Sequence, residues 1–239
     1  MTTPVITVSV GPSGAGRPGS NGAAGLAGED GLPGRYVDRV CYPSGNGTPG
    51  QTGGAASNGT AGITGTSAPQ CVIYLGGTLK GTLTILSVGG TGGAGARGGD
   101  GGPGGAGGNA GQIPQASCLT QHCVQPADGG AGGNGGAGGN GGNGAPGGNG
   151  GDVYVYYSCE NQSGHIAPSS IGGAGGQGGP GGTGGLGGTG GLNELVQGEP
   201  QTRAEAGLPG PGGVPGQNGA PGSPGKIVVT AKQTELLVS

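Results

Sequence analysis

The sequence lacks most of the side chains from which a globular core is built. Its 239 residues include no Phe, no Trp and one Met, and aromatic residues make up 3% of the chain. Charge is also scarce, since Asp, Glu, Lys and Arg account for 8% and the formal net charge is −3. So few large apolar side chains argue against a conventional enzyme domain. So little charge argues against a chain kept disordered by self-repulsion.

Two classes of partner are excluded by further absences. The 8 Lys and Arg residues are scattered singly, so no basic patch marks a nucleic-acid partner. No run of apolar residues approaches the roughly 18 that a membrane-spanning helix needs. The first ten residues lack the basic and apolar regions of a signal peptide. We therefore expect no nucleic-acid partner, no membrane insertion and no signal peptide.

Glycine is what the sequence has in abundance. It supplies 73 residues, and it recurs every third residue in the runs 16–34 and 207–225. The run 47–65 keeps the same period with one lapse at Ala56, and the runs 89–111, 129–151 and 172–191 read as Gly-Gly-X. Proline, with 19 residues, is too infrequent for collagen. Interruptions between all six runs also argue against a collagen trimer.

A period of three matches the polyproline II helix, which has three residues per turn. A column of glycines along such a helix lets a neighbouring backbone come within hydrogen-bonding distance. The fold class predicted from this period is a bundle of about six antiparallel polyglycine or polyproline II helices, with a small β-rich end and almost no α-helix.

The segments between the runs predict the organisation of one domain over residues 1–239, with a polyglycine II shaft over 11–225. Alternating β-branched and apolar residues predict a β-rich end formed by 5–10, 70–88, 152–171 and 226–239. Polar, irregular linkers predict a loop end formed by 35–46, 112–128 and 192–206. In antiparallel rods these two sets of segments gather at opposite ends.

The chain has five cysteines, which we interpret as disulfide candidates. The order of the linkers places Cys71 and Cys159 together at the β-rich end. It places Cys41, Cys118 and Cys123 at the loop end, where Cys118 and Cys123 could pair with each other or either could pair with Cys41. Reduced thiols and a metal site are the alternatives, but a CxxxxC spacing with one histidine is a weak metal signature.

No constellation of residues predicts catalysis. The two histidines, His122 and His165, fall at opposite ends and cannot share a metal ion or a catalytic dyad. Matches to GxGxxG follow from composition alone and do not indicate a dinucleotide site. We expect no enzyme activity, no metal and no cofactor.

The loop end carries the candidate binding residues, because Tyr and Arg are favoured as binding anchors. The alternative is that the tyrosines only cap the bundle and that Arg39 pairs with Asp38. The candidates for receptor binding are Tyr36, Arg39, Tyr42, Leu119, His122, Glu199 and Arg203.

Separate glycine-rich runs with loops gathered at one end resemble the receptor-binding adhesins at the tail-fibre tips of T-even-type phages. They also resemble the glycine-rich minor tail proteins of actinobacterial phages. The run 129–151 looks similar to the PGRS repeats of mycobacterial surface proteins, and springtail-type antifreeze proteins also bundle such helices. The phage adhesins carry a fibre-attachment domain ahead of their glycine-rich runs. This chain has only about ten residues before its first run.

The phage resemblance implies a virion tail-tip or fibre-tip protein made in the host cytoplasm. Its β-rich end would join other virion tail proteins, and its loop end would bind a glycan or protein of the host surface. A purely structural protein of the virion or cell surface is one alternative, with an extracellular location. An ice-binding protein is another.

Overall fold

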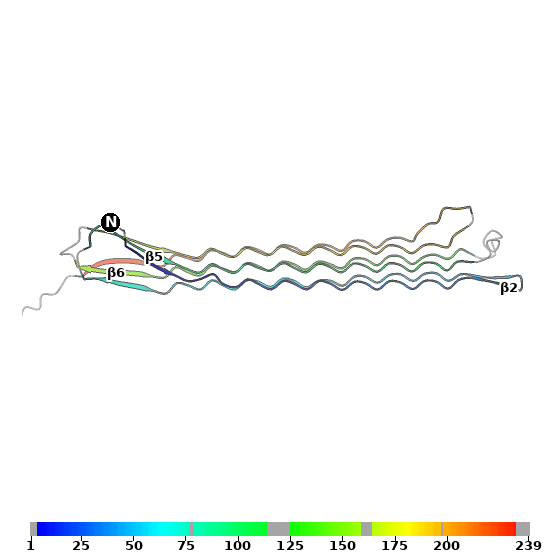
Figure 1. Ribbon diagram of the computed structural model, residues 1–239, viewed down its shortest axis with the longest axis horizontal. Helices are drawn as coiled ribbons and strands as arrows, with labels where there is room; N and C mark the ends of the chain where they lie inside the picture. Colours follow the sequence, from blue (N-terminus) through cyan, green and yellow to red (C-terminus); the bar gives the residue numbers. More distant parts are fainter. Residues whose placement is uncertain (1–3, 77–78, 114–124, 159–163, 197, 233–239) are drawn as a thin grey trace, which may run out of the picture.

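The structure, a computed structural model, describes residues 4–76, 79–113, 125–158, 164–196 and 198–232. These residues form a long, narrow rod in which extended segments run side by side along most of the length (Figure 1). Six glycine-rich segments, which are neither helix nor strand, make up the shaft. They are residues 10–34, 43–70, 89–113, 125–152, 172–191 and 204–226.

Backbone hydrogen bonds arrange these segments in two layers. The first layer contains 10–34, 89–113 and 172–191, and its bonds include Gly22 N–H to the Asp100 carbonyl (2.8 Å). The second layer contains 43–70, 125–152 and 204–226, and its bonds include Gly53 N–H to the Asn134 carbonyl (2.8 Å). Within each layer the partners advance together along both segments, so segments of one layer run parallel.

The two layers run in opposite directions and are hydrogen-bonded to each other. Gly54 donates to the carbonyl of Ala23 (2.7 Å), and Gly102 donates to the carbonyl of Gly54 (2.9 Å). These glycines allow contact between backbones that no larger residue would permit. A Cβ atom at Gly54 would lie 2.9 Å from the Ala23 nitrogen, closer than Cβ atoms approach other atoms in proteins. The glycine period thus fixes where neighbouring segments touch.

Asparagine side chains of the second layer satisfy backbone N–H groups of a neighbouring segment in the same layer. Asparagine Oδ1 atoms of the segment 125–152 accept these bonds from the segment 204–226 at 2.8–2.9 Å. Each N–H group therefore has a protein acceptor as well as access to water. The acceptors are Asn134, Asn140, Asn143 and Asn149, and the donors are Leu208, Val214, Gln217 and Ser223.

Each layer continues into a three-stranded parallel sheet at one end of the rod. One sheet has the order β1-β5-β7, and the other has the order β4-β6-β8. The strands of the first sheet lead into the segments of the first layer, and those of the second sheet follow the segments of the second layer, so each set runs parallel. The bounds are β1 (Val5–Ser9), β5 (Thr82–Val88), β7 (His165–Ile171), β4 (Cys71–Leu75), β6 (Val153–Ser158) and β8 (Ile227–Lys232).

The apolar core lies between the central strands of these two sheets. Leu83 and Ile85 of β5 cluster with Val153 and Val155 of β6. Fully burying side chains of this size stabilises a fold by about 1.5–3 kcal/mol each, so four of them matter in a chain whose shaft buries mainly backbone. Partly buried residues pack around this cluster: Cys71, Ile73, Leu75, Leu79 and Ile166.

The predicted fold class, a bundle of antiparallel polyproline II helices, is wrong. The described residues contain no helix, and their regular elements are eight strands in three small sheets, two of them parallel. The reason is that the glycine period specifies the spacing of backbone contacts and not the type of element. Regular structure forms where β-branched and aromatic residues pair across strands.

Candidate functional site

The end of the rod opposite the two parallel sheets carries a β-hairpin (Figure 1). Strands β2 (Arg35–Val37) and β3 (Val40–Tyr42) pair antiparallel. They are joined by Asp38 and Arg39, whose φ angles are 50° and 66°. Positive φ at both central residues is the backbone of a type I′ turn, the connection that suits the twist of paired strands. The sequence predicted an irregular loop here, so the hairpin is a correction to that expectation.

The hairpin gathers several exposed aromatic and β-branched side chains on two short strands. Tyr36, Val37, Val40 and Tyr42 are 46%, 48%, 50% and 48% exposed. Arg39, in the turn, is exposed as well. In the part of the chain that the structure describes, the one recorded ion pair joins Arg97 and Asp100, so a pair between Arg39 and Asp38 is not formed.

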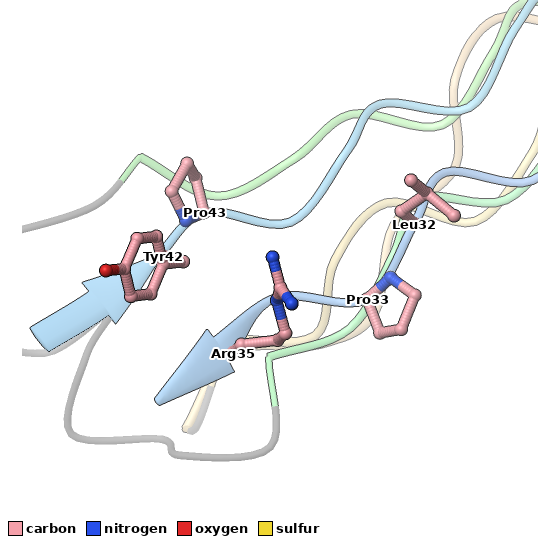
Figure 2. Close-up of a pocket in the computed structure, with 5 residues that line it drawn as sticks. All are labelled: Leu32, Pro33, Arg35, Tyr42 and Pro43. Atoms are coloured by element: carbon pink, nitrogen blue, oxygen red, sulfur yellow. The ribbon is translucent and has the colours of Figure 1, made fainter. Parts of the chain in front are cut away.

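A pocket of about 510 Å³ opens at the base of the hairpin. Figure 2 shows its lining residues, which come from the end of the first glycine-rich segment, from both strands and from the start of the second glycine-rich segment. Arg35 and Tyr42 are paired across the strands, and the Arg35 Cζ atom lies 6.0 Å from the centre of the Tyr42 ring. The lining residues are Leu32, Pro33, Arg35, Tyr42 and Pro43.

Glu194 ties three linkers together at the same end. Its side chain is buried, with 5% exposed. One carboxylate oxygen accepts hydrogen bonds from the Ser44 hydroxyl (2.8 Å) and the Ile113 N–H (2.7 Å). The other accepts a bond from the Ala127 N–H (2.8 Å). Gly34 N–H in turn donates to the Ser44 hydroxyl (3.2 Å), which connects the base of the hairpin to this cluster.

The third linker forms a closed loop of its own. Leu192 and Arg203 form an isolated β-bridge, and Arg203 Nη1 donates to the Gly190 carbonyl (3.1 Å). Glu199 is exposed, and its N–H donates to the Val196 carbonyl (3.1 Å). Figure 1 shows this yellow-to-orange loop and the blue hairpin on different sides of the shaft end. Glu199 and Arg203 therefore lie apart from the hairpin candidates.

Leu119, His122, Cys118, Cys123 and Cys159 lie outside the described residues. Cys41, in β3, is disulfide-bonded.

Cys71 is a free cysteine, so the predicted disulfide between Cys71 and Cys159 is not formed. Cys71 begins β4, and its side chain packs against the apolar cluster of the two sheets. A thiol in this position contributes to packing as a small apolar group.

Sequence reasoning did not select Arg35 or Glu194 as site residues. Arg35 belonged to a linker predicted to be irregular, and its pairing with Tyr42 depends on the hairpin. The aromatic and β-branched residues on either side of Asp38 and Arg39 were the available signal. Glu194 gave no local signal, because its partners lie far from it in sequence.

The ion pair between Arg97 and Asp100 lies on the shaft, in the first layer. Asp100 Oδ2 accepts from Arg97 Nη1 (3.0 Å), and Asp100 Oδ1 accepts from the Thr183 N–H (2.7 Å) and hydroxyl (2.8 Å). Hydrogen bonding to the Arg97 guanidinium holds the pKa of the Asp100 carboxyl well below its usual value, and the bonds from Thr183 act in the same direction. Asp100 thus links two segments of this layer.

The described residues contain neither a metal-binding cluster nor a membrane-spanning helix. No group of three or more His, Cys, Asp and Glu side chains there is placed to hold a metal ion. Within the same residues, no helix has the length and apolar character needed to cross a membrane.

Comparison with known proteins gives a weak likeness to a solved structure. No family model matches the chain, and no curated protein matches it. Among solved structures, the chain is similar to the springtail antifreeze protein from Granisotoma rainieri, described as a bundle of nine polyproline type II helices. The identity is 29%, the match covers 77% of this chain and 95% of that chain, and the TM-score is 0.13. A TM-score this low carries no argument about fold or function.

Proposed function

We propose that this chain is a virion tail-tip or tail-fibre-tip protein that recognises the host surface through its hairpin end. The observation that carries the proposal is the gathering of exposed Tyr36, Val37, Val40 and Tyr42 on one hairpin at the end of the rod. Tyrosine and arginine side chains dominate the energetics of protein interfaces, and this hairpin holds both kinds. The shaft beside it exposes few such groups.

The construction of the shaft supports a role as a rigid spacer behind the hairpin. Backbone hydrogen bonds within and between layers recur at every third residue along its length. Such a lattice resists bending, so a ligand-binding group at one end is held at a fixed distance and orientation from the other. Pre-orientation of this kind lowers the entropy lost on binding.

The opposite end suits attachment to other tail proteins. Strands β1, β7, β4 and β8 are the edges of the two parallel sheets, and sheet edges offer unpaired backbone groups to a partner strand. Tyr74 in β4 is 67% exposed and stacks on Tyr156 of β6, with ring centroids 5.1 Å apart. The proposal therefore assigns virion partners to this end.

The first experiment tests the virion assignment. Antibodies raised against the chain are used to label purified phage particles from the genome that encodes it. Labelling at one end of the tail is the expected result. Particles that contain no copy of the chain would remove the assignment.

The second experiment separates recognition from assembly. Particles carry Tyr36→Ala, Arg39→Ala and Tyr42→Ala together, and matched controls carry Leu186→Ala and Leu208→Ala at exposed shaft positions. We expect the triple variant to be incorporated normally and to adsorb to host cells roughly tenfold more slowly, because anchors of this kind carry most of a binding free energy. Normal adsorption with normal incorporation would favour a purely structural spacer instead.

A further inference from the structure

The pocket at the base of the hairpin combines one cationic group with flat apolar walls. Figure 2 shows the Arg35 guanidinium standing between Tyr42 and Pro43 on one side and Leu32 and Pro33 on the other. The pocket volume of about 510 Å³ lies in the range of small-ligand sites. The pocket is therefore large enough for a ligand of one or two rings.

The walls of the pocket are held in place by hydrogen bonds at its base. Gly45 N–H donates to the Leu32 carbonyl (2.7 Å), and Gly34 N–H donates to the Ser44 hydroxyl (3.2 Å). Ser44 is itself fixed by its bond to buried Glu194. The two sides of the pocket therefore keep their spacing without a ligand.

The charge of Arg35 is not neutralised by another described residue. Within the described ranges its guanidinium group forms neither an ion pair nor a side-chain hydrogen bond. At 6.0 Å from the ring centre, Arg35 is at the outer limit of a cation–π contact with Tyr42. A guanidinium group has five N–H donors in a planar fork that matches a carboxylate. The pocket thus has a vacant anion-binding group in a mainly apolar setting.

We propose that this pocket binds a carboxylate-bearing sugar residue, with the carboxylate paired to Arg35 and the sugar ring against Tyr42. The inference rests on the proposed function and names the chemical class of ligand for the same end. The ion pair between the carboxylate and Arg35 orients the sugar in the pocket. The apolar C–H face of the sugar ring packs against Tyr42 and the proline side chains. The hydroxyl groups of the sugar remain in water at the open side.

An acidic peptide is a poorer fit to the same walls. An Asp or Glu side chain brings a carboxylate on a short, flexible stem, so it reaches Arg35 but leaves the wall formed by Leu32 and Pro33 in water. A sugar acid brings a rigid ring together with its carboxylate. Shape and charge therefore favour the saccharide.

The test measures binding to the full chain by amide chemical shifts. The probes are a tetramer of galacturonic acid, free glucuronic acid and N-acetylneuraminic acid. The fully methyl-esterified tetramer is a control that keeps the rings and removes the charge, and tetraglutamate is the peptide control. We expect at least one acidic sugar to shift amides within residues 32–43, and we expect both controls to leave them unchanged.

Variants test the two recognition groups separately. Arg35→Lys keeps the positive charge but removes the planar set of N–H donors that can pair with both carboxylate oxygens. The dissociation constant for the acidic sugar should therefore rise about tenfold. Arg17→Lys is the matched control on the shaft. Tyr42→Ser should weaken binding, and Tyr42→Phe, which keeps the ring, should not. An unchanged affinity in Arg35→Lys would overturn the proposed pairing.

Three outcomes would overturn the ligand class: no shift with any acidic sugar, equal binding of the methyl ester, or equal binding of tetraglutamate.

Failure of the ligand proposal is distinguishable from failure of the proposed function. If adsorption still depends on Tyr36, Arg39 and Tyr42, the host-recognition role stands and the ligand belongs to another class. If sugar binds but adsorption is normal in that triple variant, the pocket stands and the host-recognition role fails.

Discussion

Ser44 and Glu194 are separated by 150 positions in the sequence, yet the Ser44 hydroxyl donates a 2.8 Å hydrogen bond to the Glu194 carboxylate. The same carboxylate accepts bonds from the N–H groups of Ile113 and Ala127. Segments from both layers of the shaft therefore converge on one buried acid. A buried carboxylate with several donors is costly to alter, because each donor left without an acceptor has lost its water as well.

Glu194→Gln tests this clamp, by which we mean the hydrogen bonds that the Glu194 carboxylate accepts from Ser44, Ile113 and Ala127. The glutamine amide has one oxygen, so its NH₂ group must face either the Ala127 N–H or the pair formed by Ser44 and Ile113, which sets donor against donor. We expect the free energy of unfolding to fall by about 1–3 kcal/mol. Chemical denaturation measures it. Glu199→Gln is the matched control at an exposed position and should change stability by less than about 0.5 kcal/mol; equal losses would contradict the clamp.

Adjacent glycines in the last segment give a sharper test of the shaft. A Cβ at Gly213 would overlap the carbonyl group of Gly139, 2.5 Å from its carbon, whereas a Cβ at Gly212 would meet only the Gly182 oxygen at 3.5 Å. We expect Gly213→Ala to destabilise the chain by about 1–3 kcal/mol through overpacking. Gly212→Ala should be neutral or stabilise by about 0.4–1 kcal/mol, because alanine restricts the unfolded chain.

Thermal unfolding of the two variants measures the difference. Their backbone environments are adjacent and neither glycine has a positive φ angle, so the comparison isolates the contact itself. The same loss of stability in both variants would show that the segment 204–226 does not pack as described.

The sequence predicted the contacts of the shaft better than the class of the fold. Glycine every third residue indicated close backbone approach, and hydrogen bonds such as Gly22 to Asp100 form at that spacing. The same period led to a bundle of helices, which was wrong. It says nothing about strands such as β5 and β6, which depend on Leu83, Ile85, Val153 and Val155 meeting across two sheets.

At the candidate site, the limits of sequence reasoning have two physical causes. In the turn, aspartate is a common residue at the position of Asp38, but Arg39 occupies the position where glycine is preferred, so local propensity does not favour its positive φ angle. Glu194 is buried by segments distant in sequence, and no local pattern encodes that meeting. Tyr36, Arg39 and Tyr42 were selected on residue type alone. That criterion requires neither the geometry of the turn nor the partners of the buried acid.

Acidification should weaken the shaft through Asp100. Its pKa in the folded chain is held below the ordinary value of 3.8 by Arg97 and Thr183. The unfolded state therefore takes up the proton first as the pH falls. The contribution of Asp100 is fully present above the ordinary pKa and is lost progressively below it.

We expect the melting temperature of the wild type to fall more steeply between about pH 4 and pH 2 than that of Asp100→Asn. Asparagine keeps one acceptor for Thr183 and removes the titrating group. Calorimetric scans across this pH range compare the two proteins, with Asp128→Asn as a control for the general effect of losing one carboxylate. Identical slopes in wild type and Asp100→Asn would contradict a depressed pKa.

The turn of the hairpin should be stabilised by residues that favour positive φ. Asp38 and Arg39 adopt φ angles of 50° and 66°, a region that costs most L-residues about 1–2 kcal/mol and that asparagine and glycine tolerate well. The double change Asp38→Asn with Arg39→Gly should therefore slow hydrogen exchange of the β2 and β3 amides by roughly fivefold. Asp38→Val should speed this exchange, because a β-branched side chain is strained at positive φ.

The double variant also removes the Arg39 guanidinium. A better-ordered hairpin that adsorbs poorly would therefore assign the loss of binding to that side chain and not to the fold. Faster exchange in the double variant would contradict the turn geometry itself.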